Sequence, residues 1–134
     1  IVTEYAGASD LVVVSAAGDT TNRILEIIDA KSDDKGVAEV LLKQLEKYQQ
    51  GLIHELLNGD VQARVLQQSQ ADFKRWYAWL NDQEEIKRRP ELLSYGELWS
   101  ARLLSALLEQ QGVTADYIDA RTFLVTIPPR WLAA

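Results

Sequence analysis

The predicted fold is decided by residues 11–22, which read Leu11-Val12-Val13-Val14-Ser15-Ala16-Ala17-Gly18-Asp19-Thr20-Thr21-Asn22. The first four residues are a continuous apolar and largely β-branched run, the pattern of a strand buried on both faces of a parallel sheet. Small and polar residues follow. An apolar helical pattern then begins at Ile24, and one of the residues 19–21 is placed to cap that helix. Residues 11–30 are therefore predicted to form a strand, a loop and a helix.

The middle of the chain is predicted to be helical. A charged linker, Lys31–Gly36, is followed by apolar residues at three- and four-residue steps over Val37–Leu56. Gly59 lies in a polar turn and is placed as a helix stop. A second apolar stripe then covers Val61–Leu80. Two long helices joined by a tight turn predict an antiparallel helical hairpin.

The last third of the chain completes an α/β pattern. Asp82–Pro90 is predicted to be a solvated, charged connection, with a basic binding site as the alternative. Apolar residues cover most of the circumference of the helix predicted over Ser94–Leu108, which is typical of a helix buried between layers. Gln110–Gly112 ends that helix, and Ala115–Asp119 predicts a second parallel strand. The predicted class is α/β, helix-rich, with few parallel strands and a long helical hairpin.

Composition places the chain among globular proteins and excludes several functions. Of its 134 residues, 47% are hydrophobic and 25% are charged, which suits one domain with a hydrophobic core. The net charge of -6 disfavours a nucleic-acid partner. The chain has no cysteine and a single histidine, His54, so neither disulfides nor a Cys- or His-rich metal site is expected. No apolar run approaches the roughly 20 residues of a membrane span, so we expect no membrane partner and a cytoplasmic location.

The segment Ser15–Asn22 is the first candidate site. Ligands of open α/β sheets lie beyond the carboxyl ends of the strands, and a helix N-terminus presents free N–H groups to anions. The hydroxyl and amide groups here suit a carboxylate or a phosphate, and the small side chains at 16–18 let a ligand approach the backbone. An ordinary strand-to-helix turn capped by threonine is the alternative. The segment is neither a GxGxxG motif nor a Walker loop.

Ser94 and Glu97 form the second candidate site. Their spacing fits a capping box, in which the glutamate reaches back to the N–H of the cap residue. The alternative is that Glu97 faces a pocket and binds a cationic group such as a substrate ammonium, with Gly96 permitting close approach. Four further residues are expected to pack rather than to bind ligands: Tyr48, His54, Trp76 and Trp79.

Two motifs carry a family resemblance. Val12–Asn22 is similar to the Val-Val-Ser-Ala-x-Gly-x-Thr-Asn segment of aspartokinases. Gly96–Leu108 is similar to their second motif, in which Gly-Glu opens a helix and Ser follows one turn later. Gln110–Gly112 and Tyr117–Arg121 continue the resemblance. The residues at 99–102, with the Gln-Gln-Gly that follows, favour the bifunctional aspartokinase–homoserine dehydrogenases of the methionine branch.

The resemblance covers residues 1–124 and has several implications. It implies that the chain is part of a three-layer α/β/α amino-acid kinase fold, whose reaction transfers the γ-phosphoryl group of ATP to the β-carboxylate of L-aspartate. It implies that Ser15 and Thr21 hold a substrate carboxylate, and that Glu97, an acceptor of matching charge, binds the aspartate ammonium. It also implies a homo-oligomeric parent that uses ATP and Mg²⁺, and NADP if it carries the dehydrogenase.

The chain also departs from the aspartokinase pattern. It lacks the Lys-Phe-Gly-Gly-Ser-Ser segment whose Lys stabilises the transferring phosphoryl group, and it has no methionine. We therefore expect a fragment without a catalytic residue, a bound cofactor or activity of its own. Tyr95 stands where the family often has His, and residues 125–134 are expected to be a tail unrelated to the family. Two alternatives remain open: a non-enzymatic helical interaction module, and an amino-acid kinase that acts on another carboxylate.

Overall fold

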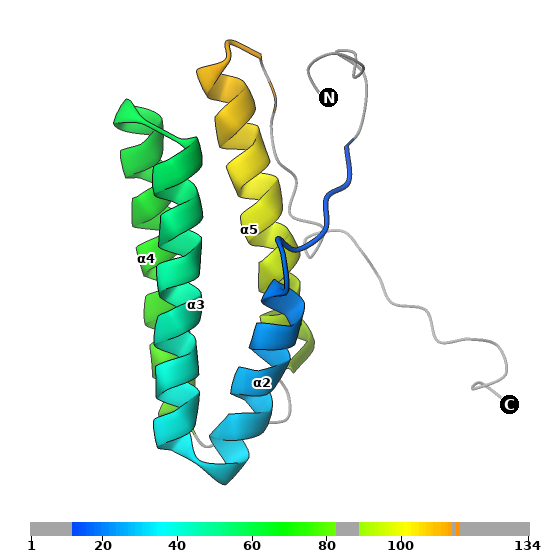
Figure 1. Cartoon of the computed structure of the whole chain (residues 1–134), viewed down its shortest axis with the longest axis vertical. Helices are drawn as coiled ribbons and strands as arrows, with labels where there is room; N and C mark the ends of the chain where they lie inside the picture. Colours follow the sequence, from blue (N-terminus) through cyan, green and yellow to red (C-terminus); the bar gives the residue numbers. More distant parts are fainter. Residues whose placement is uncertain (1–11, 83–88, 114, 116–134) are drawn as a thin grey trace, which may run out of the picture.

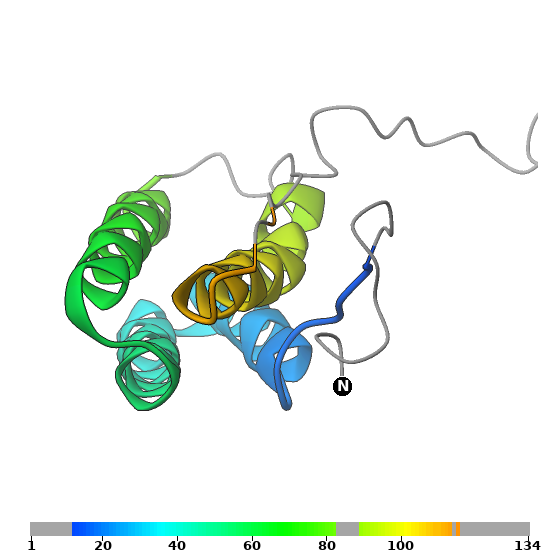
Figure 2. The same cartoon turned by 90° about the horizontal axis from the view of Figure 1, so that it is seen from above.

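The computed structural model describes residues 12–82, 89–113 and 115, and these residues form a bundle of four helices (Figure 1). The helices are α2 (Thr20–Asp33), α3 (Lys35–Leu56), α4 (Gly59–Leu80) and α5 (Arg89–Gln110). α3 and α4 form the long antiparallel hairpin that the sequence predicts. α2 packs on α3, α5 packs on α4, and α2 and α5 pack on each other (Figure 2). The buried apolar side chains form a large cluster among all four helices and a smaller one around Ile53, Leu57, Val65 and Ala106.

The predicted α/β class is wrong for the described residues, among which there is no strand. Residues 12–16 are not helical, but they belong to no sheet. Val12 is 43% exposed and Val13 is 86% exposed, whereas both were predicted to lie in a strand that is buried on both faces. A β-branched run forms a strand only where a neighbouring strand supplies backbone hydrogen bonds, and no other described segment does so. Of the second predicted strand, residues 116–119 lie outside the described residues.

The connections between helices are shorter than the charge pattern suggested. α2 covers the first half of the predicted linker, α3 begins within its second half, and only Asp34 separates the two helices. The Asp34 carboxylate caps α3 by accepting hydrogen bonds from the backbone N–H groups of Gly36, at 2.9 Å, and Val37, at 3.3 Å. Gly59 does not stop α3 as predicted. It is the first residue of α4 and adopts a φ of 57°, a left-handed conformation that glycine tolerates.

The two ends of α5 test two further predictions. α5 begins at Arg89, so Ser94 lies inside the helix, where its hydroxyl donates to the Glu91 carbonyl at 2.5 Å. The predicted capping box is therefore wrong. The predicted stop at Gly112 is confirmed: its φ is 78°, its N–H donates to the Glu109 carbonyl, and the next N–H donates to the Leu108 carbonyl. These two bonds are those of a Schellman motif, which satisfies the last carbonyls of a helix.

Aromatic side chains fill the core where α4 faces α5. Phe73 stacks on Trp99 with ring centroids 5.0 Å apart, and Tyr95 meets the edge of Trp76 at 5.7 Å. Burying each such side chain contributes about 1.5–3 kcal/mol, with a further gain from ring pairing. The predicted packing role is confirmed for Trp76 and Trp79, which are almost fully buried. Tyr48 packs as well, because the Arg23 guanidinium lies over its ring, 5.0 Å from the ring centroid.

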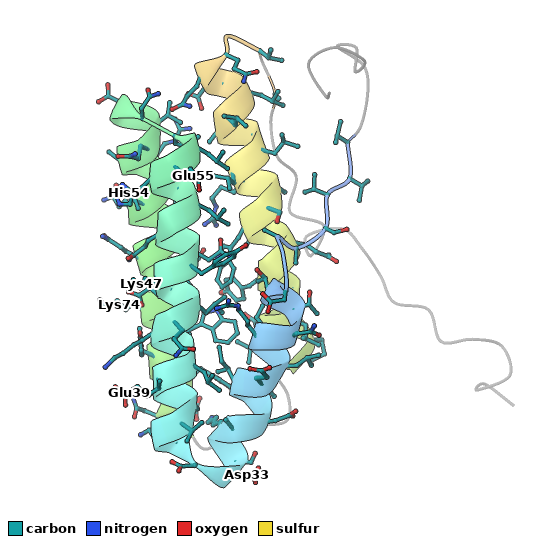
Figure 3. All side chains as sticks on the ribbon, viewed as in Figure 1. Asp33, Glu39, Lys47, His54, Glu55 and Lys74 are labelled. Atoms are coloured by element: carbon teal, nitrogen blue, oxygen red, sulfur yellow. The ribbon has the colours of Figure 1, made fainter. Side chains whose placement is uncertain are left out.

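The outer side of the hairpin is polar. His54 is exposed (Figure 3), so the prediction that His54 packs is wrong. Glu39, Glu55 and Lys74 are exposed as well. None of the four helices combines the length and the hydropathy that a bilayer crossing requires, in the part of the chain that the structure describes.

The C-terminal end of α5 is fastened to the turn between α3 and α4. The Gln110 side chain accepts a hydrogen bond from the Asn58 N–H at 2.6 Å and donates one to the Leu56 carbonyl at 3.2 Å. Arg64 of α4 forms a two-pronged ion pair with Glu109, at 3.1 and 2.5 Å, which lowers the pKa of Glu109. These contacts hold the C-terminal end of α5 against α4 and the turn before it.

Tyr77 of α4 should ionise at unusually high pH. Burial, followed by the hydrogen bond and the negative charge of Glu46 on α3, raises the pKa of Tyr77 to about 12, compared with about 10 in an unfolded chain. Because the folded-state value is the higher one, the protonated phenol stabilises the fold below pH ~10, and this contribution is lost as the pH rises through the folded-state pKa. A tyrosinate absorbance titration should therefore show a component near pH 12.

The matched variant for this titration is Glu46→Gln. It should move the late component only part of the way back, because burial, the larger cause, persists. A wild-type titration that is complete near pH ~10 would contradict the assignment.

Candidate functional site

The structure brings together the two segments that the sequence singled out. Gly96 of α5 lies against the segment that leads into α2, so closely that a Cβ on Gly96 would meet the Ala16 Cβ at 2.8 Å and the Thr20 Cγ2 at 3.4 Å. Contacts under 3.0 Å are essentially never tolerated between such atoms. The missing side chain of Gly96 therefore lets α5 touch the loop, although the two positions are 80 residues apart in the sequence.

Local bonds fix the loop that precedes α2. The Thr20 N–H donates to the Ala17 carbonyl at 3.1 Å, and the Thr20 hydroxyl donates to the same carbonyl at 2.5 Å. Gly18 adopts a φ of 54°, and a Cβ there would lie 2.8 Å from the Tyr48 hydroxyl. The loop is thus folded tightly on itself and packs against Tyr48 of α3.

The N-terminus of α2 has no side-chain cap. Asp19 occupies the N-cap position, but its carboxylate makes no capping hydrogen bond. It pairs instead with Arg23, one turn later, at 3.0 Å. No acidic residue lies in the first turn of α2, so no carboxylate in that turn opposes an anion at this helix end.

The three predicted site residues are all exposed. Ser15 lies in the loop, Thr21 in the first turn of α2, and Glu97 directly after Gly96 on α5. The neighbouring Thr20 is fully buried and serves the loop itself. The close contact at Gly96 places the segments that carry the three residues side by side. Their roles in binding stay a prediction.

A buried ionic cluster holds α5 against α4. The Asp72 carboxylate is 4% exposed, and its Oδ2 accepts hydrogen bonds from the Trp99 indole at 3.0 Å and from the Arg102 guanidinium at 2.7 Å. The exposed Arg75 lies 3.8 Å from the other oxygen. Sequence reasoning missed Asp72, although the signal was present: the residue falls within the apolar stripe of α4, one position before Phe73.

The described residues offer no metal site. Nowhere among residues 12–82, 89–113 and 115 do three or more His, Asp or Glu side chains gather in a way that could hold an ion.

The alternative basic site over residues 82–90 falls largely on 83–88, which lie outside the described residues. The tail predicted over residues 125–134 also lies outside them.

Comparison with known proteins relates nearly the whole chain to one family. Residues 1–130 match the amino acid kinase family. The chain is 37% identical over 124 residues to the bifunctional aspartokinase/homoserine dehydrogenase 2 of Escherichia coli (strain K12), an alignment that covers 92% of the chain and 15% of the relative.

Plant proteins give similar alignments. Identity to the chloroplastic bifunctional aspartokinase/homoserine dehydrogenase 1 of Arabidopsis thaliana is 33%, over 88% of the chain and 14% of that protein. Identity to the corresponding enzyme of Daucus carota is 33%, over 96% and 14%. The chain thus spans about one seventh of the length of these relatives. No solved structure matches it.

Proposed function

Because the chain belongs to the amino acid kinase family, we propose that it is the aspartate-binding part of an aspartate kinase, which transfers the γ-phosphoryl group of ATP to the β-carboxylate of L-aspartate. The observation that carries the proposal is the contact of Gly96 with Ala16, which joins the two motifs of the aspartokinase resemblance at one place. The names of the relatives support the same activity.

In this proposal the loop and the start of α2 hold a substrate carboxylate. Ser15 and Thr21 are exposed hydroxyl donors, and the uncapped N–H groups of α2 add donors and a favourable helix dipole. A carboxylate that accepts several such bonds is held more strongly than one bound by a single donor, because each bond is charge-assisted.

Glu97 supplies the opposite charge. Its side chain is exposed and follows directly after the glycine that touches the loop. A glutamate carboxylate has only acceptor oxygens, so it can accept hydrogen bonds from N–H groups of an ammonium, and it matches the ammonium's charge. Hydroxyl donors on one side and a carboxylate on the other therefore fix both the position and the direction of an α-amino acid.

We propose that the nucleotide and its metal are held elsewhere in the kinase. No acidic cluster suitable for Mg²⁺ occurs among the described residues, and the sequence contains no Lys-Phe-Gly-Gly-Ser-Ser segment. We therefore assign ATP and Mg²⁺ to parts of the kinase outside this chain, and the contribution of these residues is to hold and orient aspartate. Orientation is a large share of phosphoryl-transfer catalysis. The chain by itself should not consume ATP in the presence of aspartate.

The proposal for the longer protein extends to its setting. We propose a homo-oligomeric, cytoplasmic enzyme with neither a nucleic-acid nor a membrane partner. Because the relatives are named as bifunctional enzymes, a homoserine dehydrogenase that uses NADP is proposed for the same polypeptide.

The Glu97→Gln variant of the full-length kinase tests the site. Removing one charge while keeping the shape of the side chain should raise the KM for aspartate about tenfold or more, since a charge-assisted bond to the ammonium becomes a neutral one. The KM for ATP should change less than about twofold, because Glu97 is proposed to contact only aspartate. Steady-state kinetics with each substrate varied in turn measures both.

The matched control is Glu55→Gln. Glu55 is an exposed glutamate of α3 (Figure 3), and its replacement should leave both KM values unchanged. If Glu97→Gln also leaves them unchanged, Glu97 does not bind the substrate and the site assignment is wrong.

A further inference from the structure

We propose that Asp72 is a positioning residue, which sets the rotation and the height of α5 and thereby places Glu97 at the aspartate site. The inference rests on the proposed function, because it concerns a residue that acts through Glu97. Asp72 itself is 4% exposed and is not proposed to touch aspartate.

Asp72 contacts α5 at two successive turns. One carboxylate oxygen accepts hydrogen bonds from Trp99 at 3.0 Å and from Arg102 at 2.7 Å. Side chains three residues apart lie on the same face of a helix, one turn above the other. A single buried oxygen that binds both therefore fixes α5 against turning and against sliding, in a way that contacts between apolar side chains do not.

Glu97 lies on the other side of α5 from this cluster. A helix turns about 100° per residue, so Glu97, two residues before Trp99, points about 200° away from it. The burial pattern agrees, because Trp99 is 6% exposed and Glu97 is exposed to solvent. Any rotation of α5 that the Asp72 cluster permits is therefore passed directly to the Glu97 carboxylate.

The tolerance for such a rotation is small. A helix with its side chains has a radius of about 5–6 Å, so a rotation of about 10° moves its surface by about 1 Å. A misplacement of about 1 Å in a site that orients a substrate can cost about a hundredfold in turnover. Gly96 limits rotation from the loop side through its contact with Ala16, and Asp72 limits it from the α4 side.

The other charged groups near Asp72 do not supply the same restraint. Arg75 approaches the second carboxylate oxygen at 3.8 Å, but its side chain is 73% exposed and comes from α4 itself. A solvated pair within one helix is worth little and leaves α5 free to turn. Trp99 and Arg102 are the two residues of α5 through which Asp72 is shown to act.

Two variants of the full-length kinase test the proposal. Trp99→Phe removes the indole N–H but keeps a ring to stack on Phe73, and Asp72→Asn keeps an acceptor but removes the charge that Arg102 contacts. Each should raise the KM for aspartate about tenfold, with a change of less than about twofold in the KM for ATP. This split should persist well below the melting temperature of each variant. Glu55→Gln serves as the control for both.

The outcomes separate the inference from the proposed function. If Glu97→Gln raises the KM for aspartate but Trp99→Phe and Asp72→Asn do not, the positioning role is overturned and the binding role of Glu97 stands. If the two variants raise both KM values equally, or lower only the melting temperature, the cluster is merely structural and the inference is overturned. If Glu97→Gln has no effect, the proposed site fails, and the inference fails with it even if the Asp72 variants act. Should Asp72→Asn fail to fold, Trp99→Phe decides by itself.

Discussion

Replacing Asp72 with alanine should lower the free energy of unfolding of the chain by about 3–5 kcal/mol, the usual cost of removing one partner from a buried ion pair. The change removes the carboxylate that neutralises the guanidinium of Arg102, a side chain that is only 11% exposed. It also removes the acceptor of the Trp99 indole. Since a domain is stable by only about 5–15 kcal/mol, a loss of this size is a large part of the total. Urea denaturation followed by tryptophan fluorescence and circular dichroism measures it.

Two comparisons make this result specific. Asp29→Ala removes an exposed aspartate from the middle of α2 and should change stability by no more than about 0.5 kcal/mol. Replacing the pair together, as Asp72→Leu with Arg102→Met, should recover part of the stability, since apolar residues of similar size often replace a buried pair without loss, whereas the Trp99 indole still lacks its acceptor. A loss of less than about 1 kcal/mol in Asp72→Ala would show that the carboxylate is not buried in an ion pair.

Gly96→Ala should destabilise the chain although alanine is the better helix former. The new Cβ would lie 2.8 Å from the Ala16 Cβ, and overpacking of this kind costs about 1–3 kcal/mol. The gain in helix propensity returns about 1 kcal/mol, so a net loss of up to about 2 kcal/mol is expected. Urea denaturation measures it, as for Asp72.

Gly51→Ala is the matched control for this substitution. Gly51 lies in the interior of α3, and a Cβ there meets nothing within 4 Å. The same substitution should therefore stabilise the chain at this site by about 0.5–1 kcal/mol. The double variant Gly96→Ala with Ala16→Gly should recover stability, because it removes the atom that the new Cβ meets. Equal effects of the alanine substitutions at Gly51 and Gly96 would show that α5 does not touch the loop.

The helices could be predicted from the sequence because their signal is local. The apolar residues of α3 and α4 recur with the helical period, and the polar turn between them lies where the hairpin reverses. The ends of helices were less predictable, since one residue type serves opposite purposes. A glycine with positive φ ends α5 at Gly112 but begins α4 at Gly59. Ser94 and Glu97 match a capping box in spacing, yet α5 begins five residues earlier, at Arg89.

The strand at residues 11–14 could not be decided from local sequence. Its β-branched residues favour an extended backbone, but a strand exists only through hydrogen bonds to another strand, and no described segment offers them. The candidate site, too, could be predicted only where its signal is local. The loop and the Gly-Glu pair were recognised as motifs, whereas Asp72 was missed because its importance depends on Trp99 and Arg102, which lie 27 and 30 residues away.

The contact between Gly96 and Ala16 has a consequence for the order in which the chain folds. The hairpin of α3 and α4 closes through a turn of two residues, whereas this contact closes a loop of about 80. The entropy of loop closure grows with the logarithm of loop length, so the long loop costs about 3 kcal/mol more to close. The long loop can close only when the helices between Ala16 and Gly96 have already formed and shortened the distance between these two residues. We therefore expect the two halves of the proposed aspartate site to meet late in folding, with α5 docking on a hairpin that has formed without it.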